Sequence, residues 1–363
     1  MIEQRATSEP RTRSGSEPRS VIATLTMNPS VDRTAGLDTE LERGGVNRLG
    51  GITDVAGGKG INVARVVHDS GSAAAAESIA VFPAAESDPF VAMVREAGIA
   101  HEIVPVTAPV RVNLTVTEPD GTTTKLNAPG AELAADVQRA LIDCVAGAAR
   151  GRKRNGTPGT AGTENWAALC GSLPSGTSPD FYLSATETLH DAGLRVALDT
   201  SDAPLEALAA ALRSRTSGAP APFAPDLIKP NGLELGQLTG LDGIELERAA
   251  SAGDPRPAAE AAARLVEAGI ASVLVTLGGA GAVLATAEGA WFAEAPRIEV
   301  RSTVGAGDSS LAGYLLAAGR GLGPAERLRW AVAHGSAAAA LPGTGLPAAL
   351  DVAAAPAFAV TPL

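Results

Sequence analysis

Cysteine, histidine and aromatic side chains are scarce in this chain of 363 residues. Its two cysteines, Cys144 and Cys170, lie far apart, and its four histidines form no cluster. A disulfide framework or a zinc site needs several such residues at short spacings, so both are excluded, and a reducing cytoplasm is the expected compartment. Aromatic residues make up 3% of the chain, so Ala, Val, Leu and Ile must build the core.

Long apolar runs and a net positive charge are also missing. No apolar run reaches membrane-spanning length, and residues 1–20 are rich in Arg, Ser, Glu and Pro without the apolar centre of a secretory signal. We expect no membrane partner and interpret residues 1–20 as a disordered tail. The formal net charge of −11 and the lack of a basic stripe argue against a nucleic-acid partner. An anionic ligand must therefore be held by a few local cations.

Lysine is the rarest of the charged residues. The chain has 25 arginines but four lysines, at positions 59, 125, 153 and 229. Lys59 lies within a run of glycines and Lys229 precedes Pro-Asn, so these two mark positions where a compact ammonium group is needed rather than a planar guanidinium. For Lys125 and Lys153, chance placement is the simpler interpretation.

Short apolar strands alternate with Ala-rich helical segments along most of the chain. The pattern predicts strands at residues 21–27, 77–82, 167–170, 196–199, 227–229 and 272–277, and a helix at 61–70. Such alternation is typical of βαβ units, which form an α/β fold with a mainly parallel central sheet and helices on both faces. Functional residues should then gather at the carboxyl ends of the strands.

Two regions break this alternation. Residues 31–54 and 101–127 differ from the rest, and the second has alternating polar and apolar residues on both sides of a Pro-Asp-Gly turn. We interpret them as strands that project from the main sheet, either as a lid over the site or as a dimer contact; ordinary edge strands are the alternative. Residues 151–165 are polar and rich in Gly and Thr, which indicates a loop insertion.

The segment 303–310, with sequence TVGAGDSS, is the most informative motif. Gly305, Ala306 and Gly307 predict a tight turn into a helix, where main-chain N–H groups without partners can hold a phosphate. Asp308 then lies beside an anion, where a carboxylate is unfavourable unless it accepts the proton of an attacking hydroxyl. The alternative is a turn whose aspartate only caps the following helix.

A second glycine-rich turn, GGKGINVA at residues 57–64, enters the predicted helix with Gly58, Lys59 and Asn62. It lacks the ending of a P-loop and the spacing of a dinucleotide-binding motif. Together with Asn28 and Asp32 it would offer donors and acceptors to sugar hydroxyls. By itself, such a run is about as often a purely structural turn.

Two further segments follow predicted strands. In KPNGLE, at residues 229–234, Asn231 and Glu234 share the face of a helix N-terminus, where a carboxylate can position hydrated Mg²⁺ and nucleotide phosphates. A capping box is the alternative, and spacing alone favours it. Around Thr276, Gly278 and Gly281, small residues allow a nucleotide to approach the main chain closely, although a simple turn explains them as well.

Taken together, these motifs closely resemble the ribokinase-like sugar kinases, in particular their phosphofructokinase B branch. The resemblance extends from residue 21 to about residue 345 and rests on several motifs in the order of the family. It implies a three-layer α/β/α sandwich with a small β-strand lid, formed by residues 21–350 and followed by a C-terminal extension at 351–363. It also implies Mg²⁺ and ATP as cofactors and a homodimer joined through the lids.

Within this branch, the chain is most similar to members that phosphorylate fructose 1-phosphate, with tagatose 6-phosphate and fructose 6-phosphate as alternative acceptors. Two features depart from that pattern: Val110 stands where a threonine is usual, and VFPAA at 81–85 replaces a glycine-rich turn. A sugar-phosphate sensor without catalysis is a further alternative, although it would not require Asp308. A nucleoside kinase is another alternative, but it would not need the two extra cations, Lys59 and Arg111, that we expect to hold the phosphate of the sugar.

The resemblance and the motifs together give each expected site residue a role. We expect Asp308 to act as general base, with the main chain of Gly305, Ala306 and Gly307 stabilising the transferred phosphoryl group. Lys59 and Arg111 would hold the phosphate of the sugar. The remaining expected residues are Asp32, Gly58, Asn62 and Asn113 for the sugar, Lys229, Asn231, Glu234, Thr276, Gly278, Gly281 and Gly307 for ATP, and Glu234 again for Mg²⁺ through water.

Overall fold

The structure, a computed structural model, describes residues 20–70, 76–150, 164–215 and 221–363. The expected disordered tail and nearly all of the expected insertion at 151–165 lie outside the described residues. Among the helices that are described, none is long and apolar enough to cross a membrane.

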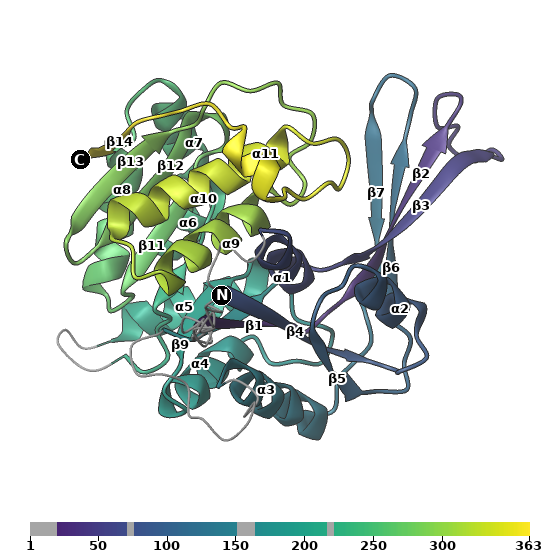
Figure 1. Ribbon diagram of the computed structural model, residues 1–363, viewed down its shortest axis with the longest axis horizontal. Helices are drawn as coiled ribbons and strands as arrows, with labels where there is room; N and C mark the ends of the chain where they lie inside the picture. Colours follow the sequence, from purple (N-terminus) through teal and green to yellow (C-terminus); the bar gives the residue numbers. More distant parts are fainter. Residues whose placement is uncertain (1–19, 71–75, 151–163, 216–220) are drawn as a thin grey trace, which may run out of the picture.

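Within the described part of the chain, a sheet of ten strands forms the centre of the molecule (Figure 1). Its order is β14-β13-β12-β11-β10-β9-β8-β1-β4-β5. Neighbours from β11 to β5 pair in parallel, whereas β12, β13 and β14 continue the sheet antiparallel. The strands are β1 (Ser20–Thr26), β4 (Ala76–Ala84), β5 (His101–Pro105), β8 (Trp166–Cys170), β9 (Arg195–Asp199), β10 (Leu227–Ile228), β11 (Ser272–Thr276), β12 (Gly281–Thr286), β13 (Gly289–Glu294) and β14 (Val360–Pro362). The expected mainly parallel sheet is confirmed.

Helices cover both faces of this sheet. Along β11, Val273 and Val275 pack into one buried cluster and Leu274 into the other, as the alternation of side chains in a strand requires. The first cluster includes side chains of α3 (Ala135–Ala149), α4 (Phe181–Asp191), α5 (Asp202–Ser214), α6 (Gly232–Thr239), α7 (Gly243–Ser251) and α8 (Arg256–Glu267). The second includes side chains of α1 (Lys59–Asp69), α9 (Ala306–Gly319) and α10 (Pro324–Ala339). The chain thus folds as three α/β/α layers.

A smaller sheet, which we call the lid sheet, projects from the body (Figure 1). Its order is β3-β2-β6-β7, and its strands are β2 (Ser30–Leu37), β3 (Leu49–Gly57), β6 (Arg111–Thr117) and β7 (Thr123–Asn127). Helix α2 (Pro89–Glu96) packs near its base, where Phe90 joins a third cluster with Phe82 and Val31. The expected lid segment 101–127 begins too early, because residues 101–105 form β5 of the large sheet.

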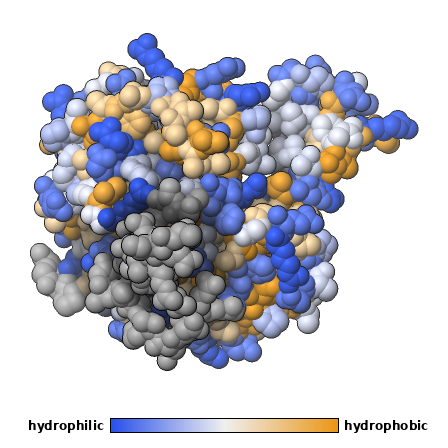
Figure 2. Space-filling view, viewed as in Figure 1, coloured by the Kyte–Doolittle hydropathy of each residue, from blue (hydrophilic) through white to orange (hydrophobic). Residues whose placement is uncertain are grey.

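The end of the chain lies against the body. Helix α11 (Ala349–Ala353) contacts α10, and β14 pairs with β13 at the edge of the large sheet. Apolar side chains gather over α11 on the face shown in Figure 2, where Leu350 is largely exposed. Residues 351–363, expected as an extension, therefore include a strand of the central sheet.

Helix α9 is buried on all sides. It lies between α1 and α10, and its residues from Asp308 to Ala318 are all inaccessible to solvent or nearly so. Gly313 makes the close approach of α10 possible, because an added Cβ would lie 2.4 Å from the carbonyl oxygen of Trp330. Packing on both sides therefore fixes the position and direction of the N-terminus of α9.

Gly313→Ala should destabilise the fold by about 1–3 kcal/mol, because the new methyl group has no room between α9 and α10. Gly147→Ala on α3 is the matched control: its Cβ would meet no atom within 4 Å, so the higher helix propensity of alanine should leave stability unchanged or raised. Urea unfolding at equilibrium measures both changes. Equal stabilities of the two variants would contradict the packing described for α9.

Candidate active site

Three helix N-termini and the carboxyl ends of the central strands meet at one edge of the large sheet. Helix α1 begins at Lys59, α6 at Gly232 and α9 at Ala306. Asp199 ends β9, and Lys229 directly follows β10. The motifs that are far apart in the sequence thus come together where a parallel α/β sheet normally binds its ligands.

The turn into α9 has the conformation that the glycine motif predicts. Gly305 is the N-cap with φ 75°, a left-handed conformation that favours glycine, and the N–H of Ser309 donates to its carbonyl at 2.8 Å. The N–H of Ala306 points back to the carbonyl of Thr303 at 3.4 Å. Gly307 and Asp308 lie in the first turn, where helical geometry leaves main-chain N–H groups free to hold an anion.

The carboxylate of Asp308 lies in this first turn and is almost fully buried. Asn62 donates to its Oδ2 through Nδ2 at 2.7 Å. Burial, followed by the nearby charge of Asp199, raises the pKa of Asp308 to about 6, although Lys59, Asn62 and Lys229 act in the opposite direction. A carboxylate with this pKa is ionised near neutral pH and is a stronger base than an exposed aspartate. Asp308 is therefore suited to accept a proton from a hydroxyl group.

Asp199 forms ion pairs with two lysines near the turn into α9. Its Oδ1 lies 2.7 Å from Nζ of Lys59, and its Oδ2 lies 3.1 Å from Nζ of Lys229. Burial alone would raise the pKa of Asp199, but the two ammonium groups outweigh it and hold that pKa below its usual value. Burial would likewise lower the pKa of Lys59, but the charges of Asp199, Asp308 and Glu234 raise it. Lys59 therefore remains charged in the site.

Sequence reasoning missed Asp199. The sequence places it as the last residue of a predicted buried strand, and its only signal is that position at the carboxyl end of a central strand. No local motif surrounds it. Its partners lie 140 and 30 residues away in the chain, so their convergence is visible only in the fold.

The expected sugar-binding residues lie at the base of the lid sheet. Asp32 accepts hydrogen bonds at Oδ1 from Ser30 Oγ at 2.7 Å and from Asn113 Nδ2 at 3.1 Å. Gly57 lies so close that a Cβ there would overlap the carboxylate of Asp32, and Gly58 has a φ of 116°. The structure thus brings Asp32, Asn113 and Gly58 together, with carboxylate and amide oxygens suited to hydroxyl groups.

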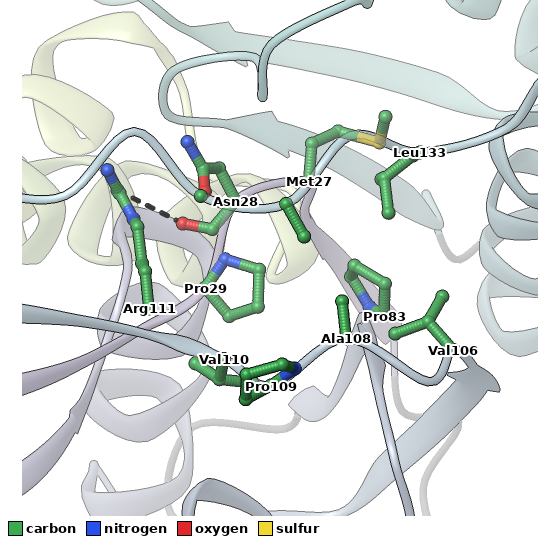
Figure 3. Close-up of a pocket in the computed structure, with 12 residues that line it drawn as sticks. Met27, Asn28, Pro29, Pro83, Val106, Ala108, Pro109, Val110, Arg111 and Leu133 are labelled. Atoms are coloured by element: carbon green, nitrogen blue, oxygen red, sulfur yellow. Dashed lines mark hydrogen bonds between the residues drawn. The ribbon is translucent and has the colours of Figure 1, made fainter.

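Arg111 links the lid sheet to two loops. Its Nη1 donates to the carbonyl of Ala128 at 2.7 Å and its Nη2 to the carbonyl of Asn28 at 3.1 Å, the second contact being drawn in Figure 3. Burial lowers the pKa of Arg111 and outweighs the charge of Asp32. These two hydrogen bonds use two of its five N–H donors, so the guanidinium retains donors for a phosphate.

A small cavity adjoins Arg111 and Asn28 where the lid sheet joins the body (Figure 3). Its other walls are Met27, Pro29, Pro83, Val106, Ala108, Pro109, Val110, Gly130, Ala131 and Leu133. The cavity measures about 20 Å³, which is room for one water molecule. It is therefore too small to be a sugar site by itself.

At the start of α6, Asn231 and Glu234 form a complete capping box. The N–H of Glu234 donates to Asn231 Oδ1 at 2.8 Å, and the N–H of Asn231 donates to Glu234 Oε2 at 2.9 Å. The structural alternative for this motif is thus observed. Glu234 can still take part in ligand binding, because the capping box uses only one of its two carboxylate oxygens. Its charge also raises the pKa of Lys59.

Thr276 and Gly278 lie beside the capping box. Asn231 and Thr276 form an isolated parallel bridge, so the loop after β11 runs next to α6. Gly278 is exposed, with no atom within 4 Å of the position that a Cβ would take, and leaves an open surface there. Gly281 is explained by packing, because a Cβ there would lie 2.0 Å from the carbonyl oxygen of Ala293 on β13.

The three α/β/α layers and the projecting lid sheet are those of the ribokinase-like sugar kinases. The model of the pfkB family carbohydrate kinases matches residues 25–350, and the chain belongs to this family. It is therefore a phosphotransferase that acts on a hydroxyl group, as the sequence motifs predict.

Among known proteins, the chain is similar to 1-phosphofructokinases. That of Escherichia coli K12 is 34% identical over 296 residues, which cover 81% of this chain and 83% of the relative. That of Rhodobacter capsulatus is 34% identical over 329 residues, which cover 90% and 92%. The structure of phosphofructokinase-2 from Escherichia coli in complex with substrates and products has a TM-score of 0.75 at 28% identity, covering 92% of this chain and 97% of that one.

Asn62→Ala should raise the pKa of Asp308 above about 6, because it removes a hydrogen bond that favours the ionised carboxylate. Carboxyl ¹³C NMR of protein labelled at aspartate measures this pKa, and Asp308→Asn identifies the signal. Gln138→Ala removes an amide from α3, on the other face of the sheet, and should leave the value unchanged. A pKa near 4 for Asp308 in the unsubstituted protein would contradict the buried environment described here.

Proposed function

We propose that this protein is an ATP-dependent 1-phosphofructokinase, which converts fructose 1-phosphate and ATP to fructose 1,6-bisphosphate and ADP. The observation that carries the proposal is the buried Asp308, a base with a pKa of about 6 at the N-terminus of α9. The 1-phosphofructokinases among its relatives support this choice of acceptor.

The reaction is an in-line transfer of the γ-phosphoryl group. The acceptor hydroxyl oxygen forms a bond to the γ-phosphorus while the bond from that phosphorus to the β–γ bridging oxygen breaks, and ADP leaves with the electron pair. Asp308 accepts the hydroxyl proton. Main-chain N–H groups of the first turn of α9, with Gly307 among them, stabilise charge on the transferred group.

The fructose phosphate lies between the lid sheet and the body in this proposal. Asp32 accepts hydrogen bonds from its hydroxyl groups, and Asn113 donates to them or accepts from them. Gly58 has no side chain and so allows the sugar to approach the main chain closely. The remaining N–H donors of Arg111 and the ammonium of Lys59 hold its phosphate. Asn62 contacts the sugar in addition to donating its hydrogen bond to Asp308.

ATP lies along the neighbouring edge, near Lys229, Asn231, Thr276 and Gly278, with Gly281 behind them. Within the described residues, no group of three or more His, Cys, Asp or Glu side chains could hold a metal alone. This fits Mg²⁺, which commonly binds one or two carboxylates together with water and substrate phosphates. The second oxygen of Glu234 suits such a hydrated ion, which supplies positive charge beside the phosphates.

The test is release of ADP with Mg²⁺ and ATP across fructose 1-phosphate, fructose 6-phosphate, tagatose 6-phosphate and unphosphorylated sugars. Fructose 1-phosphate should give the highest kcat/KM. Asp308→Asn should lower kcat by about 10²- to 10⁴-fold and leave binding of the sugar phosphate measurable, because it removes the base but keeps the shape of the side chain. Activity of this variant close to that of the unsubstituted protein would refute the role of Asp308.

The same assay decides between fructose 1-phosphate and fructose 6-phosphate. Fructose 6-phosphate is a distinct candidate, because a phosphofructokinase-2 structure in complex with it aligns to 93% of this chain with a TM-score of 0.75. The VFPAA segment at residues 81–85 favours that side of the branch as well. A higher kcat/KM for fructose 6-phosphate would select this alternative.

We also infer that two copies of the chain join through their lid sheets. The lid sheet and its loop expose large apolar side chains beside polar ones (Figure 2), namely Val46, Leu49, Ile52, Val112 and Leu126. Burying such a surface against a second copy would remove it from water. A solved relative, phosphofructokinase-2 of Escherichia coli, has a tetrameric inhibited form.

Ile52→Asp should convert the dimer to a monomer, because it places a charge within the proposed apolar contact. Ile244→Asp is the matched control, because Ile244 is 69% exposed on α7, away from the lid sheet. Light scattering after size exclusion measures both masses. A monomeric unsubstituted protein, or an Ile52→Asp variant that stays dimeric, would contradict the inference.

A further inference from the structure

Two of the four lysines in the chain converge on one carboxylate. Lys59 comes from the start of α1 and Lys229 from the segment after β10, and each binds a different oxygen of Asp199. In a chain that uses arginine for nearly every other cation, this pairing indicates that two compact ammonium groups are required here.

We propose that Asp199 is a positioning residue for phosphoryl transfer: it fixes the ammonium groups of Lys59 and Lys229 at the floor of the site without touching either substrate. This role rests on the proposed function of the site. The side chain of Asp199 has no exposed surface, so it acts through the two lysines. Those of Lys59 and Lys229 are 34% and 5% exposed, so Lys59 is the one that reaches the open site.

The two lysines lie beside the groups that perform the chemistry. The Nζ of Lys229 is 3.2 Å from the position of a Cβ on Gly307, so this ammonium group lies against the first turn of α9. The charge of Lys59 acts on Asp308. A lysine has a long, flexible stem, and a fixed carboxylate orders it during folding rather than during the reaction.

Asp199 also sets the electrostatic environment of the base. The charged and polar groups that face Asp308 are Asp199 from β9, Lys59 and Asn62 from α1, and Lys229 after β10. Of these, Asp199 is the only one that raises the pKa of Asp308. Neutralising Asp199 therefore lowers that pKa, whereas loss of a purely structural contact would leave it in place.

The first test is Asp199→Asn, which keeps the shape of the side chain and removes its charge. Its kcat should fall by about 10²-fold because the lysines are no longer held, and the acid limb of its pH–rate profile should move to lower pH. A kcat within about threefold of the unsubstituted enzyme, together with an unmoved acid limb, would overturn the proposal.

Asp226→Asn is the matched control. Asp226 is also an ion-paired carboxylate with little exposure, held by His190 and Arg195, but it lies at the opposite end of β10 from Lys229. This variant should lose stability and keep both kcat and the acid limb. A shift of the acid limb equal to that of Asp199→Asn would assign the effect to general loss of buried charge and overturn the proposal.

A second measurement does not require turnover. With ¹⁵N-labelled lysine, the chain gives four side-chain Nζ signals, which single Lys→Arg substitutions assign. In the unsubstituted protein, Lys59 should stay protonated above the ordinary pKa of a lysine side chain, about 10.4, because the charges of Asp199, Asp308 and Glu234 raise the pKa of Lys59. In Asp199→Asn its titration should move to lower pH.

Titration of Lys59 at the ordinary pKa of a lysine side chain, about 10.4, in the unsubstituted protein would overturn the contact between Lys59 and Asp199. A different result would contradict the proposed function: no release of ADP with any of the sugar phosphates, while the lysines titrate as expected. The two measurements therefore separate the position of the lysines from the identity of the reaction.

Discussion

Two carboxylates and two ammonium groups share the floor of the site, and the rest of the chemistry depends on their balance. Burial would neutralise an isolated Asp199 or Asp308, since a charge is costly away from water. The lysines keep Asp199 ionised, and burial together with the charge of Asp199 raises the pKa of Asp308 to about 6, although the lysines act to lower it. A base of intermediate strength results from opposing charges that the fold brings together.

The fold supplies this balance through rigid elements. Asp199 ends a central strand, Lys59 begins a helix and Asp308 lies in the first turn of another helix that is buried on all sides. None of the three is on a free loop, so small movements of the surface leave their distances unchanged. The lid sheet is different, because it projects from the body (Figure 1). At its base, Arg111 donates hydrogen bonds to the loops at Asn28 and Ala128.

Local patterns in the sequence predict the secondary-structure elements and the motifs well, but not which distant residues come into contact in the fold. The turn at Gly305 and the parallel strands follow from glycine positions and from apolar periodicity, which are local signals. The capping box at Asn231 and Glu234 was the simpler alternative for its motif, and the structure contains it. The two lysine partners of Asp199 and the place of residues 101–105 in the large sheet depend on contacts between distant segments, so no local pattern identifies them.

The most direct measurement is a crystal structure of Asp308→Asn with fructose 1-phosphate and a non-hydrolysable ATP analogue. The acceptor hydroxyl oxygen should lie about 3 Å from the side chain of residue 308 and in line with the γ-phosphorus. Main-chain N–H groups of the first turn of α9 should be directed at the γ-phosphate. A sugar bound with no hydroxyl group near residue 308, or a γ-phosphate away from that turn, would contradict it.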